Sequence, residues 1–306
     1  VVPDLPKHRE RVICPPASSV QEAAGRPLVA RTNDCLTLRW EGFTAGDEAW
    51  VLLTADRHLD SKLSDRKLQR QHLDLARERR AMVLDFGDLF DAMQGRDDRR
   101  GSKGSVIEAA QSDNYFNAIV NDAAEFLAPY ADQMAMIGQG NHEQAVTNRH
   151  EICLRDSLID LLRYKHGATS LHPGGYTGWV RFQFKIHTKL RSIKLWYAHG
   201  HGGGGAVTKG VIKSARRSEV IANADIVVSG HTHERYMVDR PRKWLKDSGA
   251  QEIRNQLHLN IPSYKANGAW EEANELPPKL PGAWWLRFYV KNSENGVIGI
   301  EPTPAR

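Results

Sequence analysis

Five short apolar segments in this chain are each followed at once by a cluster of Asp, Asn, His or Gly residues. The segments cover residues 50–55, 81–84, 134–137, 193–198 and 226–228. Apolar runs this short, bounded by polar residues, are typical of buried β-strands. Because the strands of an open α/β sheet end at one common crevice, side chains that follow different strands can meet there. The pattern therefore predicts an α/β protein with one site at its strand ends.

The clusters offer oxygen and imidazole donors but no cysteine. They comprise Asp56 and His58, then Gly87 and Asp88, then Gly140 with Asn141, His142 and Glu143, then His199, Gly200 and His201, and finally Gly230, His231, Thr232 and His233. These donors suit Zn, Mn or Fe rather than a metal bound by thiolates. Asp56 and His58 stand two residues apart at a strand end, so both side chains point to one face. The adjacent Asn141 and His142 must diverge, so one can bind a metal while the other faces a ligand.

The remaining pattern predicts helices, two sheets and an N-terminal extension. Helices are expected over residues 61–80, 105–127, 150–165 and 208–222, the first capped by Ser61 or Ser64. Residues 180–186 alternate between apolar and polar, as a half-exposed strand does, and further strands are expected at 256–261, 284–290 and 296–300. Residues 1–44 are rich in proline and predict an extension packed on the surface, with one strand near residues 35–40. Residues 45–306 then form a single α/β domain with two sheets.

Composition excludes several classes of protein. No apolar run approaches the ~20 residues that a membrane span needs. Three widely spaced cysteines, in a chain that opens without a basic and apolar leader, indicate neither a disulfide framework nor a zinc finger, and they favour a cytoplasmic location. The net charge of +5 is mild. It fits an anionic substrate, and it leaves nucleic acid possible but not favoured.

The five clusters, in this order over residues 56–233, resemble the signature of the calcineurin-like metallophosphoesterases. The resemblance implies a four-layer αββα sandwich with two mixed β-sheets and a pair of divalent metal ions. It assigns Asp56, His58 and His233 to the first metal, Asn141, His199 and His231 to the second, Asp88 to a bridge between them, and His142 to the substrate rather than to a metal. His201 is also followed by glycine, so it remains an alternative to His199 and a candidate for substrate binding.

The chemistry of such a site follows from the charge of a phosphoester. Anionic oxygens repel a nucleophile, and two cations ~3.5–4 Å apart neutralise that charge and lower the pKa of a shared water. A hydroxide that bridges the metals would then attack phosphorus, with Asp88 and Asn141 holding the metals and His142 serving the leaving oxygen. Glu143, Asp85 and Asp91 are candidates for orienting the ligands, although Asp85 and Asp91 are equally expected as turn or cap residues.

Two further segments have open interpretations. The loop at residues 94–104 carries Arg96, Arg99, Arg100 and Lys103, and is either a solvated loop or a substrate flap in which Arg96 contacts the substrate. The glycine run at residues 202–205 lacks the Lys and Ser/Thr of a phosphate-binding loop, so it is expected as a rim beside His199.

The substrate is predicted from residues that this chain lacks. The phosphoprotein-phosphatase branch of the family carries arginines where this chain has Ala92 and Gln139, neither of which can bind a phosphate in a bidentate way. A dianionic monoester loses more from that absence than a diester does, so a phosphodiesterase is favoured. A nuclease and a phosphomonoesterase with the same centre are alternatives. A non-catalytic scaffold on this fold is a remote one, because it predicts missing ligands and none is missing.

Overall fold

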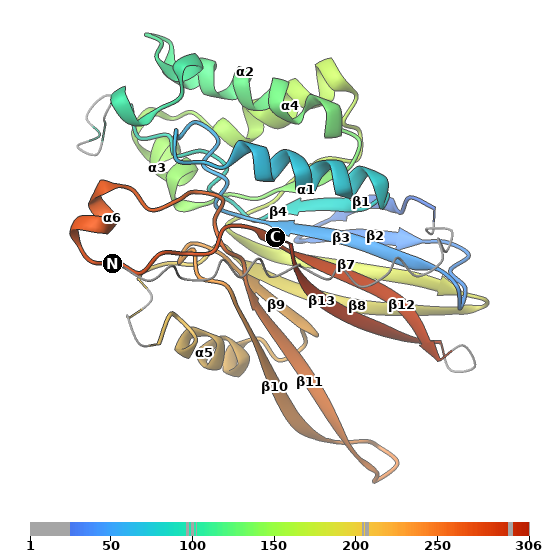
Figure 1. Ribbon diagram of the computed structural model, residues 1–306. Helices are drawn as coiled ribbons and strands as arrows, with labels where there is room; N and C mark the ends of the chain where they lie inside the picture. Colours follow the sequence, from blue (N-terminus) through green and yellow to red (C-terminus); the bar gives the residue numbers. More distant parts are fainter. Residues whose placement is uncertain are drawn as a thin grey trace, which may run out of the picture.

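Two mixed β-sheets lie face to face in the computed structural model, which describes residues 25–95, 98, 101, 103–203, 205, 208–292 and 296–305 (Figure 1). The seven-stranded sheet has the order β1 (Leu28–Thr32), β2 (Cys35–Trp40), β7 (Thr177–Ile186), β8 (Lys189–Ala198), β9 (Ile226–Ser229), β11 (Gln251–Asn260) and β10 (Tyr236–Leu245). The six-stranded sheet has the order β13 (Val297–Ala305), β12 (Ala283–Asn292), β3 (Glu48–Thr54), β4 (Met82–Asp85), β5 (Met134–Ile137) and β6 (His172–Pro173). Strands β3 to β6 are parallel, and β12 closes onto β3 in the antiparallel sense.

Side chains that alternate along the strands fill the space between the sheets. Val51 and Leu53 of β3 pack in the core between the sheets, whereas Leu52 packs on the helical side. On the opposite sheet, Phe182 and Phe184 of β7 meet Phe288 of β12, with ring centroids 4.8 and 5.3 Å apart. The period of two that the sequence shows at residues 180–186 is therefore the period of the core.

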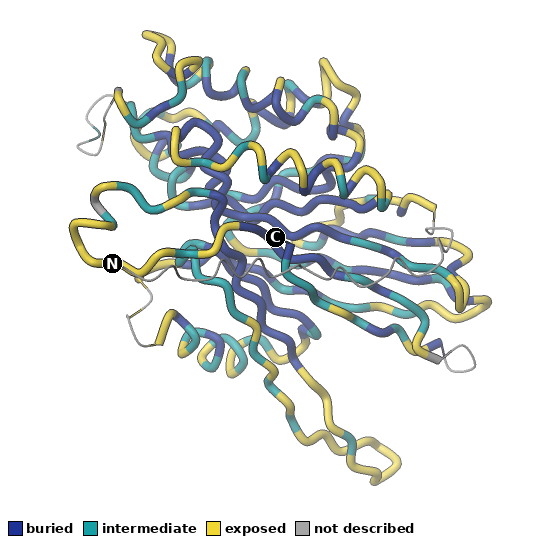
Figure 2. Tube along the Cα trace, viewed as in Figure 1, coloured by how far each residue is buried: buried dark blue, intermediate teal, exposed yellow. Residues whose placement is uncertain are grey.

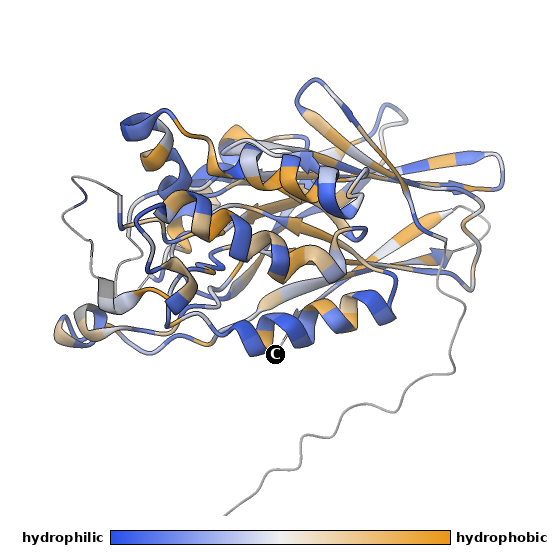
Figure 3. Cartoon of the chain, turned by 90° about the horizontal axis from the view of Figure 1, so that it is seen from above, coloured by the Kyte–Doolittle hydropathy of each residue, from blue (hydrophilic) through white to orange (hydrophobic). Residues whose placement is uncertain are grey.

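Helices cover the outer faces of the two sheets (Figure 1). Four of them, α1 (Arg66–Glu78), α2 (Tyr115–Leu127), α3 (Asn141–His150) and α4 (Leu154–His166), lie on the side of the six-stranded sheet. The helix α5 (Ile212–Val220) lies on the side of the seven-stranded sheet, and α6 (Ala269–Ala273) belongs to the excursion between β11 and β12. Seen from the helical side, apolar and polar residues alternate along the covering helices (Figure 3). The predicted single α/β domain with two mixed sheets is confirmed.

Two predicted helix starts are wrong for local reasons, and one helix was not predicted. The helix expected from residue 105 begins at Tyr115, and two 3₁₀ turns, Lys103–Ser105 and Glu108–Ala110, precede it. Ser112 Oγ accepts a hydrogen bond from the backbone N–H of Asn114, and such local bonds compete with a helix. The N-cap of α1 is Asp65 rather than Ser61 or Ser64, because its carboxylate accepts from the N–H of Leu68 at 2.9 Å. The helix α3, which begins at Asn141, was not predicted.

The expectation of a surface extension up to residue 44 needs correction for residues 28–40. Strands β1 and β2 form an antiparallel pair, and β2 adds in parallel to β7. Leu36 and Leu38 are buried in the core between the sheets. The folded unit therefore includes these two strands, and residues 1–24 lie outside the described residues.

Strand β10 was also missed, because Asp, Arg, Lys and Pro interrupt its pattern. It pairs along its full length with β11, and the two form a hairpin whose far end is exposed (Figure 2). Among the described residues, no helix combines the length and the apolar character that crossing a bilayer demands.

Candidate metal centre

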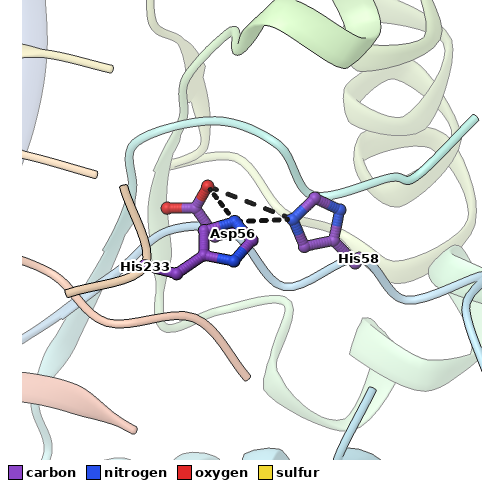
Figure 4. Close-up of side chains that lie close together, drawn as sticks. All are labelled: Asp56, His58 and His233. Atoms are coloured by element: carbon purple, nitrogen blue, oxygen red, sulfur yellow. Dashed lines mark hydrogen bonds and ion pairs between the residues drawn. The ribbon is translucent and has the colours of Figure 1, made fainter. Parts of the chain in front are cut away.

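Asp56, His58 and His233 meet at the strand ends and form the first of three groups of possible metal ligands among the described residues (Figure 4). The second is Asp88, His199 and His231, and the third, which shares His58 with the first, is His58, Asp91 and His142. Asp56 and His58 follow β3, and His233 follows β9. The Oδ1 atom of Asp56 lies 3.2 Å from Nε2 of His233 and 4.0 Å from Nε2 of His58. The two imidazole nitrogens are 3.3 Å apart. These three donor atoms therefore aim at one point.

Asp88, His199 and His231 form the second group. The Oδ2 atom of Asp88 lies 3.0 Å from Nε2 of His199. The amide oxygen of Asn141, in the first turn of α3, lies 3.2 Å from the same nitrogen. An amide oxygen, a carboxylate and two imidazoles thus stand together after β4, β5, β8 and β9.

The two groups adjoin each other. The Oδ1 atom of Asp56 is 3.9 Å from Nε2 of His199, and its Oδ2 atom accepts a hydrogen bond from the N–H of His231 at 2.9 Å. His142 lies beside them, because its N–H donates to Asp88 Oδ1 at 2.9 Å and its Nε2 is 3.8 Å from Asp88 Oδ2. The seven predicted ligands and His142 therefore occupy one region.

Of the two other predicted substrate contacts, His201 and Arg96, the structure describes only His201. His201 is exposed, and its carbonyl accepts a hydrogen bond from Lys213. Its imidazole belongs to neither ligand group, which favours His199 as the ligand from this loop. Arg96 lies outside the described residues, as do Arg99 and Arg100.

The surroundings of the Oδ1 atom of Asp56 indicate whether the site fits a metal ion. Oδ1 of this carboxylate is buried and accepts no hydrogen bond of good geometry among the described residues, although Nε2 of His233 lies 3.2 Å from it. A buried carboxylate oxygen without a well-formed hydrogen bond costs free energy, and this one faces three imidazole nitrogens. A divalent cation would satisfy this oxygen, and carboxylate, amide and imidazole donors suit Mn, Zn or Fe. The residues therefore fit divalent metal ions.

The backbone around the site is strained. Five of the predicted ligands have left-handed φ angles, namely Asp56 (50°), His58 (45°), Asp88 (51°), His231 (68°) and His233 (57°). Each such residue costs ~1–3 kcal/mol, and such costs concentrate at functional sites. Two glycines allow the close packing: a Cβ atom at Gly140 would lie 2.0 Å from Asp88 Oδ1, and one at Gly230 would lie 2.5 Å from Asp56 Oδ2.

Opposite charges dominate the electrostatics. Burial opposes ionisation of Asp88, but the imidazoles of His199 and His142 outweigh it and hold the pKa of Asp88 well below its usual range. Burial would lower the pKa of His199, yet the carboxylates of Asp88 and Asp56 raise this pKa to about 10. Burial and the neighbouring His199 lower the pKa of His231 to about 4. The site is thus a set of carboxylates that attracts positive charge.

Hydrogen bonds that Nδ1 donates to backbone carbonyls orient two of the imidazoles. Nδ1 of His199 donates to the carbonyl of Phe86 at 3.0 Å, which leaves the lone pair of Nε2 for a metal. Nδ1 of His142 donates to the carbonyl of Asp91 at 2.5 Å, which points Nε2 toward Asp88. Nδ1 of His58 lies 2.8 Å from Oδ1 of Asp91.

Asp91, Glu143 and Asp85, which were expected to orient the ligands, contact different groups. Asp91 contacts imidazoles, as expected. Glu143 binds backbone instead: its carboxylate accepts from the N–H groups of Gly140, Asp88 and Phe90 at 2.9, 3.1 and 3.0 Å. Burial and the neighbouring Asp88 raise the pKa of Glu143 to about 7. Among the described residues, Asp85 contacts no imidazole. It pairs with Arg57 at 2.8 Å and accepts from the N–H of Gly87 at 3.1 Å, so the alternative expectation of a turn residue holds and the orienting role is wrong.

Sequence reasoning missed two sets of supporting residues. The carboxylate of Asp60 accepts from the N–H groups of Asp91 and Ala92 at 2.5 and 3.0 Å, and from the hydroxyl of Tyr115 at 2.5 Å. Residues 263–265 follow β11 and bond to the loops after β3 and β4. Both sets follow strands that end at the site, so the strand-end rule that found the ligands could have found them too.

Comparison with known proteins gives structural likenesses only. No family model matches the chain, and no curated protein matches it. Among solved structures, it is similar to Vps29 of Entamoeba histolytica complexed with Zn²⁺ (13% identity, 84% of this chain and 99% of that chain, TM-score 0.33). It is also similar to a predicted phosphoesterase from Streptococcus pneumoniae (13%, 84% and 98%, 0.28) and a metallophosphoesterase from Sphaerobacter thermophilus (12%, 84% and 89%, 0.34). Because these TM-scores lie below 0.5, the fold and the site rest on the topology and side chains described above.

Proposed function

We propose that this protein hydrolyses phosphoesters, preferentially phosphodiesters, with two divalent metal ions. One observation carries the proposal: two groups of carboxylate and imidazole donors adjoin each other, and the buried Oδ1 of Asp56 between them accepts no hydrogen bond of good geometry among the described residues. His142 belongs to neither of these two groups but lies with His58 and Asp91 in the third, which shares His58 with the first, and we assign it to the substrate because its Nε2 faces Asp88 Oδ2. This arrangement supports metal-assisted attack on a bound ester next to a histidine that exchanges protons.

The donors divide between the two cations by proximity. Asp56, His58 and His233 would hold the first, and Asn141, His199 and His231 the second. Asp88 contacts His199 of the second group and His142. Its assignment to the first ion as well is what the family resemblance implies. Bound cations of this kind neutralise phosphate charge and lower the pKa of a water between them. Mn, Zn and Fe all accept these donors.

His142 would act on the proton of the leaving group. Its Nδ1–H is fixed by the carbonyl of Asp91, so only Nε2 is free to take up and release a proton. Nε2 faces the same space as Asp88 Oδ2, 3.8 Å away. From there an imidazolium can donate to the oxygen that departs from phosphorus.

The preference for diesters rests on Ala92 and Gln139. Ala92 has no polar side chain, and Gln139 is committed elsewhere, since it donates to Gln144 at 3.2 Å and accepts from Arg155 at 3.1 Å. Neither position offers the bidentate cation that a dianionic monoester favours. Phosphomonoesters and nucleic acids would use the same centre and are the alternatives to test. A scaffold without catalysis is disfavoured, because every donor is present.

A substrate panel tests the proposal. The full chain, loaded with Mn²⁺, is compared on bis-p-nitrophenyl phosphate, p-nitrophenyl phosphate and a single-stranded oligonucleotide, with a chelator as control. We expect metal-dependent turnover that is highest on the diester. Monoester turnover far above diester turnover would refute the diester preference, cleavage of the oligonucleotide above both would favour the nuclease, and the absence of any turnover would refute the hydrolase.

A further inference from the structure

A three-residue segment late in the chain holds the backbone next to the first ligand. Residues 263–265 follow β11, and Ser263 Oγ donates to the carbonyl of Asp56 at 2.8 Å. The N–H of Tyr264 donates to the same carbonyl at 3.2 Å. The side chain of Tyr264 is fixed in turn, because its hydroxyl lies 2.8 Å from Nδ1 of His72.

Lys265 extends this contact to the loop after β4. Its Nζ lies 2.9 Å from both carboxylate oxygens of Asp91, and its N–H donates to Ser263 Oγ at 2.8 Å. The two side chains are 14% and 5% exposed, so water competes little for this pair. A charge-assisted contact to both oxygens fixes the rotation of a carboxylate as well as its position.

Asp91, held in this way by Lys265, contacts the Nδ1 atoms of two imidazoles. Its Oδ1 lies 2.8 Å from Nδ1 of His58, and its carbonyl accepts from Nδ1 of His142 at 2.5 Å. A carboxylate on Nδ1 keeps the proton there and leaves the lone pair of Nε2 for a metal. Nε2 of His58 is the atom that faces Asp56 and His233.

We propose that Lys265 is a positioning residue for the first metal site. By holding both oxygens of Asp91, it sets the orientation of His58 and thereby the affinity of the Asp56, His58 and His233 group for its cation. The inference rests on the proposed function, because it takes this group to be a metal site. Among the described residues, the ammonium of Lys265 bonds to Asp91 alone, so its removal leaves the other contacts of the segment in place.

Calorimetric titration of the full, metal-free chain with Mn²⁺ tests the inference. The wild type is expected to bind two ions. Lys265→Met is expected to bind one ion about 10–100-fold more weakly, the usual cost of losing a group that orients a metal ligand, and the other with unchanged affinity. Lys194→Met is the control, because Lys194 is also of intermediate exposure and, among the residues that the structure describes, its Nζ bonds to the side chain of Asn223 at 2.7 Å, away from the site.

A double-variant cycle separates positioning from a general loss of structure. If Lys265 acts through Asp91, Lys265→Met should change metal affinity little in the background of Asp91→Asn. If Lys265→Met does not fold, as circular dichroism would show, Lys265→Gln replaces it, since Gln keeps a donor and loses the charge.

The outcomes are distinct. Two ions bound by Lys265→Met with wild-type affinities would overturn the inference alone, as would equal losses in both backgrounds of the cycle. A wild type that binds no Mn²⁺ would overturn the metal centre and this inference together.

Discussion

The Nε2 atoms of His58 and His233 lie 3.3 Å apart, although 175 residues separate them in the chain. Two imidazole nitrogens at this distance either share a proton or face a common cation, because their lone pairs repel each other. Oδ1 of Asp56 lies within 4.0 Å of both. A negative oxygen beside two lone pairs favours the cation.

Metal binding should stabilise the fold. A ligand present at 100 times its dissociation constant stabilises the native state by about 2.7 kcal/mol, so the melting temperature should rise with Mn²⁺ and fall again with a chelator. Asp56→Asn should lose most of this rise, because the substitution removes the charge of the carboxylate. Thermal unfolding with and without Mn²⁺ measures both, and an equal rise in the variant would contradict the assignment of Asp56.

Asp88→Asn should lower metal content. The imidazoles of His199 and His142 keep the carboxylate of Asp88 ionised. Its Oδ2 atom lies 3.0 Å from Nε2 of His199. An amide keeps the shape but not the charge, so we expect fewer than two ions per chain by elemental analysis after dialysis. Full loading together with wild-type activity would show that Asp88 does not bind the metals.

His142→Ala should separate metal binding from chemistry. His142 is not among the seven proposed ligands, so we expect both metals to remain bound, and loss of one ion would instead make His142 a ligand together with His58 and Asp91. Loss of a proton donor typically lowers kcat by about 10²–10⁴-fold, and this loss should be smaller for substrates whose leaving group needs no proton. Elemental analysis alongside kcat on an alkyl and a nitrophenyl diester checks this, and intact turnover on the alkyl ester would refute the role of His142.

Arg57→Met should destabilise the fold by about 3–5 kcal/mol, because it leaves Asp85 charged and buried without a partner. Both side chains are fully buried, and Arg57 also bonds to Gln69 at 3.0 Å. Denaturant unfolding measures the effect. Arg26→Met is the matched control: Arg26 pairs with Asp132 at the surface, where such pairs contribute ~0–1 kcal/mol. Equal effects of the two variants would contradict the prediction.

Stability should fall in mild acid through His258. Burial and the nearby Arg240 and Arg217 lower the pKa of His258 to about 4 in the folded protein, against ~6.5 in an unfolded chain. Between these values only the unfolded chain binds the proton, so this contribution is complete above pH ~6.5 and is lost as the pH falls toward 4. Partial screening reduces the effect to about 1–2 kcal/mol at pH 5. His258→Gln, unfolded in denaturant at pH 7.5 and pH 5, should lack this part of the pH dependence, and an unchanged slope would contradict it.

The sequence was most informative where one local pattern determines the structure. The apolar segments before Asp56, Asp88 and His231 are strands, and alternation at residues 180–186 predicted a core face. These elements were predictable because burial on one or both faces leaves a direct trace in the residue order.

The missed features depend on contacts between distant segments. Strand β10 takes its place from pairing with β11 despite Pro241 and its charges. The helix α3 begins inside the cluster at Gly140 to Glu143, where Glu143 bonds back to the N–H of Gly140 and of Asp88. The position of Lys265 after a strand could have been predicted, but its contact with Asp91 could not, because Asp91 lies 174 residues earlier.

The 263–265 segment also sets when the centre can form during synthesis. All seven donors have left the ribosome once His233 emerges, yet the carbonyl of Asp56 and the carboxylate of Asp91 still await Ser263 and Lys265. Strand β3 likewise awaits its neighbour β12. A nascent chain that ends at residue 240 would carry all seven proposed donors without these contacts, so we expect it to bind metal more weakly than a chain that includes residues 263–265 and β12.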